Sequence, residues 1–106
     1  MRVISKSRLR RFWQNPGHAD AEQPLLAWYR VVSNHDVSWT CFADIREIYG
    51  DASLFEDCVI FNIKGNSYRL ISRVRYRSHK LYIVDVLTHK EYDKDKWKQH
   101  CRCAVK

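Results

Sequence analysis

The stretch that decides the fold, SYRLISRVRYR at residues 67–77, alternates apolar and basic side chains. One face carries large apolar side chains, at Tyr68, Leu70, Val74 and Tyr76. The other face, called the Arg face below, carries Arg69, Ile71, Arg73, Arg75 and Arg77. Because successive side chains of a strand point to opposite faces of a sheet, this pattern predicts a β-strand. We expect its apolar face to pack against a core and its Arg face to point away from that core.

The runs on either side predict the rest of a sheet. Residues 58–64 and 81–87 are also rich in β-forming side chains, and Gly65-Asn66 is a two-residue loop of the kind that closes a tight hairpin. Three sequential strands form a meander, to which residues 1–4 add a fourth strand.

Helical spacing of apolar residues dominates the first half of the chain. Leu9, Phe12 and Trp13 lie on one side of a first helix, which follows Ser5 as N-cap and ends at Asn15-Pro16-Gly17. The other expected elements are a helix from about Asp20 to Ser33, a helix at 41–49, a polar loop at 51–57 and a short polar helix at 91–100. The predicted fold is α+β, a mainly antiparallel four-stranded sheet with helices packed on one face and a short C-terminal helix.

Length and charge restrict the function. A chain of 106 residues fits a single domain, 1–106, and buries about 60 to 70% of its extended-chain surface, so any site lies on an open surface or in a shallow cleft. The net charge is +7. Residues 1–15 and 64–80 hold eleven basic and no acidic residues, whereas 16–63 are acidic. Such a field suggests a polyanion such as nucleic acid as partner, and the alternative is a basic surface that only aids solubility.

Other classes are disfavoured. No segment approaches the length of a membrane span or the apolar core of a secretory signal, so we expect a cytoplasmic protein. The four cysteines, Cys41, Cys58, Cys101 and Cys103, lack zinc-type spacing, and we interpret them as buried or free thiols. No carboxylates or histidines show ligand spacing, so we expect no metal and no cofactor, and any phosphate chemistry here would be metal-free.

The Arg face is the first candidate site. Four guanidiniums on one strand repel one another, and an anionic ligand would neutralise them and accept bidentate hydrogen bonds. The alternative is a solvated strand face with extended Arg side chains, and Arg77, near the turn, fits that alternative best.

The second candidate is the run 88–93, Thr-His-Lys-Glu-Tyr-Asp, directly after the last strand. An imidazole exchanges protons near neutral pH, and an ammonium can stabilise charge developing on phosphate. The alternative is structural, with Thr88 capping the last helix, Glu91 and Asp93 in its first turn and Tyr92 packing.

Together these groups meet the requirements of a metal-free ribonuclease. The 2′-OH of RNA is an internal nucleophile, so the protein supplies a base, an acid for the departing 5′ oxygen and cations for the phosphorane. DNA lacks that hydroxyl and would stay intact.

Three runs, 61–71, 88–93 and 21–29, together closely resemble the HigB toxins of bacterial type II toxin-antitoxin modules, and the resemblance extends from residue 1 to about 97. It implies a RelE-like fold and a cytoplasmic mRNA interferase that acts on translated messages at the ribosome. It also implies neutralisation by a HigA-type helix-turn-helix antitoxin, through which the complex binds operator DNA. The tail 99–106 departs from the family pattern, and 36–57 matches it less sharply.

The resemblance also implies site residues. The expected catalytic residues are Arg69, His89, Lys90 and Tyr92. Their expected roles are proton transfer by His89, phosphate stabilisation by Arg69 and Lys90, and base stacking or proton relay by Tyr92. The expected RNA-binding residues are Lys64, Asn66 and Arg73, to which the Arg face adds Arg75.

Two other functions remain open from the residues alone. A non-enzymatic RNA- or DNA-binding module would use the Arg face only to grip phosphates, but it has no need of a titratable imidazole beside a lysine. A purely structural or protein-interaction domain fits the acidic middle of the chain, but it explains neither candidate site.

Overall fold

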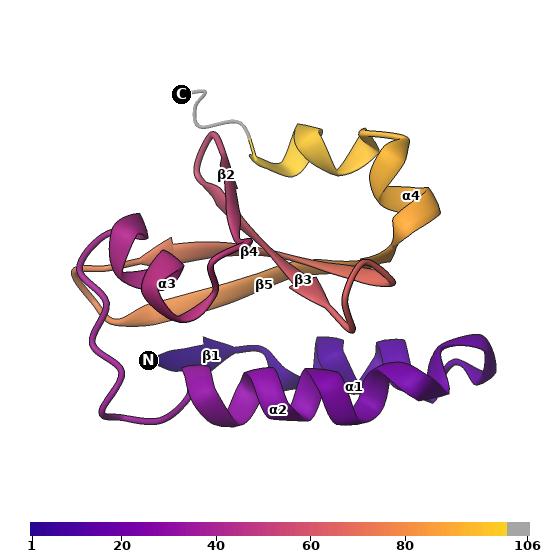
Figure 1. The fold of residues 1–106 in the computed structure, drawn as a ribbon, viewed down its shortest axis with the longest axis horizontal. Coiled ribbons are helices and arrows are strands. Elements are labelled where there is room, and N and C mark those ends of the chain that lie inside the picture. The colour runs from indigo at the N-terminus through magenta and orange to yellow at the C-terminus, as the bar shows by residue number, and fades with distance from the viewer. Residues whose placement is uncertain (102–106) are drawn as a thin grey trace.

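A computed structural model describes residues 1–101 as a sheet with helices on both faces (Figure 1). The strands are β1 (Arg2–Ile4), β2 (Ser53–Phe55), β3 (Cys58–Ile63), β4 (Tyr68–Arg75) and β5 (Lys80–Thr88). The helices are α1 (Lys6–Gln14), α2 (Glu22–Val32), α3 (Phe42–Ile48) and α4 (His89–Asp93), with 3₁₀ helices η1 (Pro16–Ala21) and η2 (Lys96–Cys101). None of these helices is long and apolar enough to cross a membrane. The predicted α+β class is confirmed.

The sheet has five strands in the order β1-β5-β4-β3-β2, so the predicted four-stranded sheet is wrong in detail. The meander β3-β4-β5 is antiparallel as expected, and β1 pairs parallel to β5. The extra strand, β2, lies within the predicted loop 51–57 and pairs with β3. Three residues are too few to show an alternating pattern, so the sequence gives no strand signal there.

The hairpin between β3 and β4 turns as predicted. Gly65 and Asn66 are the central residues of a turn that the backbone hydrogen bond from Ser67 N to Lys64 O closes at 3.1 Å. Lys64 and Gly65 both have positive φ, a conformation that glycine adopts at little cost and lysine does not.

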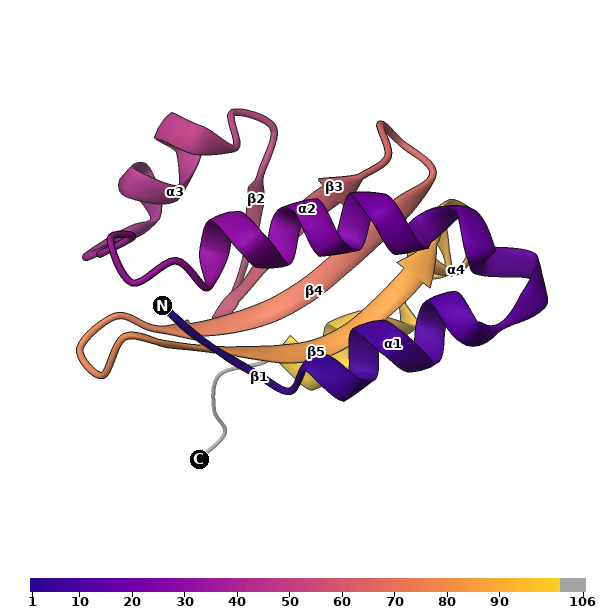
Figure 2. The same cartoon turned by 90° about the horizontal axis from the view of Figure 1, so that it is seen from below.

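The main core lies between the sheet and helices α1, α2 and α3. Figure 2 shows α1 and α2 lying side by side across this face of the sheet. Leu9 and Leu25 project from these two helices and are fully buried against Phe61 and Leu70 of the sheet. Burying each such side chain contributes about 1.5 to 3 kcal/mol. Because the buried cluster on this face is the larger of the two, this face accounts for most of the hydrophobic stabilisation.

The opposite face is not open as predicted, because the C-terminal segment folds over it (Figure 1). Ile60 and Ile71 pack there against Trp97, and a disulfide joins Cys58 of β3 to Cys101 of η2. The interpretation of these two cysteines as thiols is therefore wrong; a pair separated by 43 residues leaves no spacing signal. Cys41 is an exposed free thiol, and Cys103 lies outside the described residues.

The single helix predicted at 91–100 is in fact two short helices. Thr88 begins α4 through a capping box, in which its hydroxyl accepts from Glu91 N at 3.1 Å and Glu91 Oε1 accepts from Thr88 N at 3.0 Å. The chain then turns at Asp95, whose φ is 62°, and η2 runs back over the sheet. Thr88 therefore caps the last helix, as the structural interpretation of the run 88–93 predicts.

Strand β5 contains an irregularity that positions side chains at its free edge. Ile71 pairs with Asp85 while the adjacent Ser72 pairs with Ile83, so Val84 is an extra residue of β5, as in a β-bulge. The Val84 carbonyl accepts a hydrogen bond from Arg8 Nη1 of α1 at 3.0 Å. The bulge therefore changes, relative to the first half of the strand, which side of the sheet Asp85 and the residues after it point to.

Candidate functional site

Arg69 lies under helix α4 and is only 8% exposed, which corrects the expectation that it faces an open sheet surface. Its guanidinium donates to Asn66 O at 3.1 Å, to Tyr68 O at 3.3 Å and to Asn66 Oδ1 at 3.4 Å. All three acceptors are neutral, and among residues 1–101 Arg69 has no ion pair. A buried cation that is compensated only by neutral oxygens favours the approach of an anion.

Tyr92 contacts Arg69 from above. The Arg69 Cζ atom lies 5.0 Å from the centre of the Tyr92 ring, which also stacks on Trp97 at 5.0 Å with an interplanar angle of 9°. Trp97 Nε1 donates to Tyr92 O at 2.9 Å, so η2 holds both the ring and the backbone of Tyr92. The Tyr92 ring therefore lies in contact with both the Arg69 guanidinium and the Trp97 indole, which corrects the expectation that it is free to stack on a base.

His89 lies beside this pair at the start of α4. Its Nδ1 atom is 3.0 Å from Asp93 Oδ2, its side chain is half exposed, and its backbone N–H donates to Ser67 O at 3.1 Å. A carboxylate on Nδ1 orients the ring, which leaves Nε2 able to exchange a proton with a ligand. Lys90, the next residue, is exposed.

Lys64 is directed away from this cluster. Its Nζ atom lies 2.5 Å from Asp20 Oδ2, and the Tyr68 hydroxyl donates to the other oxygen of Asp20. Hydrogen bonds from Lys64 and Tyr68 lower the pKa of the Asp20 carboxyl. The hydrogen bond between Tyr68 and Asp20 in turn raises the pKa of Tyr68 to about 12. Sequence reasoning missed Asp20, which joins η1 to the β3–β4 hairpin.

The remaining residues of the Arg face are separated from Arg69 along the sheet. Arg73 Nε lies 3.2 Å from Asp57 Oδ2, in a partly exposed ion pair. Arg75 is exposed, and both side chains line a hollow that also contains Arg8. Arg77 lies in the turn after β4. The structure thus gathers Arg69, Asn66, Tyr92 and His89 at one end of the sheet and leaves Arg73 and Arg75 at the other.

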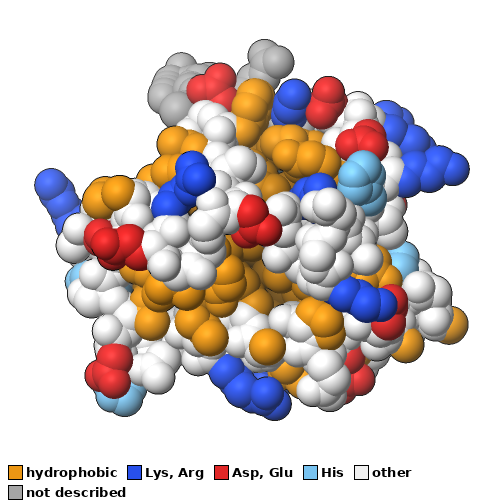
Figure 3. Space-filling model, viewed as in Figure 1, with side chains coloured by type: hydrophobic (Ala, Val, Ile, Leu, Met, Phe, Trp, Pro, Cys, Tyr) orange, Lys and Arg blue, Asp and Glu red, His pale blue; other side chains and the backbone are white. Residues whose placement is uncertain are grey.

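Figure 3 shows the distribution of charged and apolar side chains on one side of the molecule. On the side seen in Figure 3, basic side chains are scattered around the rim, with apolar side chains in the hollow between them. Acidic side chains lie among the basic ones, so the basic side chains form no single continuous patch on this side.

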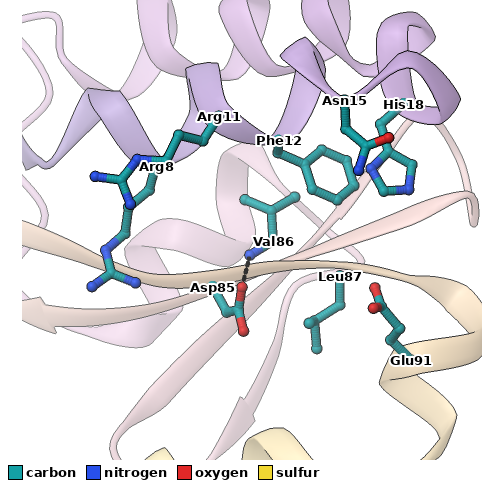
Figure 4. Close-up of a pocket in the computed structure, with 9 residues that line it drawn as sticks. All are labelled: Arg8, Arg11, Phe12, Asn15, His18, Asp85, Val86, Leu87 and Glu91. Atoms are coloured by element: carbon teal, nitrogen blue, oxygen red, sulfur yellow. Dashed lines mark hydrogen bonds between the residues drawn. The ribbon is translucent and has the colours of Figure 1, made fainter.

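A cleft of about 330 Å³ between α1 and β5 was not predicted (Figure 4). Its lining side chains are Arg8, Arg11, Phe12, Asn15, His18, Asp85, Val86, Leu87 and Glu91. The available signals in the sequence were the Arg-rich helix at the N-terminus and a lone carboxylate inside the apolar run 81–87. Partial desolvation by the surrounding protein raises the pKa of that carboxyl, Asp85.

A small basic α+β domain is thus defined, in which a buried guanidinium and a carboxylate-oriented imidazole lie at the same end of a sheet. The chain belongs to the HigB toxin family, described as the RelE-like toxic component of a toxin-antitoxin system, whose model matches residues 21–95. The match begins one residue after Asp20 and includes helix α2. It also includes all four residues of the cluster, Asn66, Arg69, His89 and Tyr92.

Curated relatives carry the same family name. The chain is similar to the mRNA interferase toxin HigB of Escherichia coli K12 and to the mRNA interferase HigB proteins of Escherichia coli O157:H7 and Shigella flexneri. Each match is 50% identical over 34 residues, which covers 32% of this chain and 33% of the relative.

Proposed function

We propose that the protein is the toxin of a type II toxin-antitoxin module and cleaves mRNA as a metal-independent endoribonuclease. The observation that carries the proposal is the buried Arg69 guanidinium, which has only neutral partners and lies at the same end of the sheet as the His89–Asp93 pair. The relatives named as mRNA interferases support the choice of RNA as substrate.

The proposed reaction is an attack of the 2′-OH on the adjacent phosphorus. The 2′ oxygen loses its proton to a base and bonds to phosphorus, the bond from phosphorus to the 5′ oxygen breaks, and that oxygen takes a proton. The products are a 2′,3′-cyclic phosphate, which hydrolysis opens to a 3′-phosphate, and a 5′-OH. His89 transfers a proton through Nε2, while Arg69 and Lys90 stabilise the phosphorane.

Tyr92 takes its place in this scheme through its ring, which positions Arg69, and Asn66 holds the same guanidinium from below. Arg73 and Arg75 would bind RNA phosphates at the other end of the strand, and Lys64 would do so only after leaving Asp20. Because these residues lie at both ends of β4, the proposed contacts with RNA extend over several nucleotides.

The proposed partners follow from the family. A toxic component of a toxin-antitoxin system has an antitoxin, and we propose a HigA-type helix-turn-helix protein that carries the complex to operator DNA. We also propose that cleavage takes place on the translating ribosome in the cytoplasm. A cleavage assay with purified protein, with and without ribosomes, tests this last point.

The direct test is induced expression followed by mapping of new 5′-OH ends in mRNA. We expect wild type to arrest growth and generate such ends, and His89→Ala to abolish both. His35→Ala, which changes an exposed histidine outside the cluster, is the matched control and should behave as wild type. RNA binding that weakens steeply with salt but never leads to cleavage would instead identify a non-enzymatic binding module.

A further inference from the structure

The cleft between α1 and β5 is a second collection of chemical groups outside the Arg69–His89 cluster (Figure 4). Its α1 wall presents two guanidiniums, from Arg8 and Arg11, one turn apart on the helix. Its opposite wall presents the carboxylates of Asp85 and Glu91. Within residues 1–101, neither guanidinium forms an ion pair with either carboxylate.

The contacts these groups do make leave most of their capacity unused. Among residues 1–101, Arg8 gives one of its five N–H donors to Val84 O, and Asp85 Oδ1 accepts only from the neighbouring Val86 N at 2.9 Å. Glu91 Oε1 serves the Thr88 cap. Arg11, which is exposed, has no side-chain hydrogen bond among the described residues. Two cations and the second oxygen of Asp85 are therefore available to a ligand.

The bulge in β5 explains why Asp85 is here. The extra residue Val84 shifts the second half of the strand by one position, and bulges characteristically redirect a side chain. Arg8 and Asp85 also satisfy backbone groups at the β5 edge, Val84 O and Val86 N, so the edge does not offer those groups to an added strand. The cleft therefore suits a small polar ligand better than a peptide strand.

Aromatic rings close one end of the cleft. Phe12 and His18 stack with ring centres 4.2 Å apart and an interplanar angle of 9°. The Nδ1 atom of His18 is buried and has no hydrogen-bond partner in the described part of the chain. Buried polar atoms normally have hydrogen-bond partners, so His18 Nδ1 can form a hydrogen bond that the described residues do not supply.

The cleft also adjoins the proposed catalytic cluster. Leu87 and Glu91 line it, and they flank His89 along the chain at the junction of β5 and α4. Leu87 also pairs with Arg69 across β4 and β5, so a ligand in the cleft lies near the Arg69 end of the proposed catalytic cluster.

We infer that this cleft binds one nucleotide of the substrate RNA, with Arg11 and Arg8 on its phosphate and Asp85 on the exocyclic amino group of its base. The inference rests on the proposed function for the identity of the polymer. A carboxylate oxygen accepts from the amino groups of adenine, cytosine and guanine, whereas uracil presents carbonyl oxygens there. The cleft thus selects against uridine at one position near the cut.

The test is titration of the His89→Ala protein with AMP, CMP, GMP and UMP, followed by NMR. We expect the three amino-bearing nucleotides to bind in the cleft and UMP to bind at least about fivefold more weakly. Arg11→Ala should weaken AMP binding about tenfold, as expected for loss of a charge-assisted contact. Arg10→Ala, on the same helix but outside the cleft lining, is the matched control and should have little effect.

Asp85→Asn tests the base contact separately and keeps the shape of the side chain. It should bring UMP to within about twofold of AMP, and circular dichroism checks that the variant is folded. Equal binding of UMP and AMP to the Asp85-containing protein, or equal effects of Arg10→Ala and Arg11→Ala, overturns the inference even if wild type cleaves RNA. Conversely, selective nucleotide binding by a protein that cleaves no RNA overturns the proposed function and leaves the cleft assignment standing.

Discussion

The guanidinium of Arg69 and the ring of Tyr92 form a cation–π contact of 5.0 Å that joins strand β4 to helix α4. The contact links two runs that are well separated in the sequence, and it makes the position of Arg69 depend on the C-terminal segment, because Trp97 stacks on the same ring. The ring of Tyr92 therefore has a positioning role that does not need its hydroxyl group.

This relationship predicts different results for two changes at Tyr92. Tyr92→Phe keeps the ring and should retain at least about half of the RNA cleavage rate, whereas Tyr92→Ala should lose about 10- to 100-fold because Arg69 is no longer held. Single-turnover cleavage with both variants measures this. A large loss in Tyr92→Phe, with an unchanged melting temperature, would show that the hydroxyl relays a proton.

Arg69 itself should not tolerate lysine. An ammonium keeps the charge but cannot donate to Asn66 O and Asn66 Oδ1 together in the planar geometry of a guanidinium. We expect Arg69→Lys to lower the cleavage rate at least about tenfold while the protein stays folded. Arg77→Lys, at an exposed position in the turn after the same strand and outside the proposed site, is the matched control and should change the rate less than about threefold.

The Cys58–Cys101 disulfide should stabilise the docked C-terminal segment. Its loss should lower the free energy of unfolding by about 2 to 4 kcal/mol, because the bond closes a long loop of the unfolded chain. Calorimetry of Cys101→Ala with and without a thiol reductant measures the effect. Cys41→Ala, at the exposed free thiol, serves as control, and equal melting temperatures of the two variants would contradict the prediction.

The alternation in 67–77 predicted the strand and its faces, but not what covers the Arg face. The two signals for a cover were Ile71 among the arginines and Trp97 within a polar helix, and both are buried in the structure. Neither signal says that the two residues meet. That contact depends on the turn at Asp95 and on the disulfide, and long-range pairings of this kind leave no local pattern.

Only part of the candidate site could be predicted from the sequence, because some of the contacts that assemble it are also long-range. Arg69, Asn66, His89 and Tyr92 come together because the pairing of Tyr68 with Thr88 brings the ends of two adjacent strands side by side. Arg8 and Asp85 come together only because α1 crosses the free edge of β5 beside a bulge. A bulge depends on strand register, which the pattern of side chains in one strand does not specify.

The Asp20 contacts predict a dependence of stability on acid. The pKa of Asp20 is lowered in the folded state, so the ionised carboxylate stabilises the fold above the ordinary pKa of 3.8, and this contribution is lost as the pH falls below it. We expect the melting temperature of wild type to fall more steeply than that of Asp20→Asn between about pH 5 and pH 3. Asp36→Asn, which changes an exposed carboxylate, should keep the wild-type slope.

The capping box of α4 should affect both stability and catalysis, because the helix it begins carries His89. Thr88→Ala removes the hydroxyl that accepts from Glu91 N and should cost about 1 kcal/mol of unfolding free energy, whereas Thr88→Ser retains an equivalent oxygen. Loss of the cap also lets the first turn of α4 fray, so the His89–Asp93 pair should form less often. Cleavage by Thr88→Ala should therefore fall several-fold relative to Thr88→Ser at a temperature where both variants are fully folded. Equal rates for the two variants would mean that the backbone bond from His89 N to Ser67 O is enough to position the imidazole.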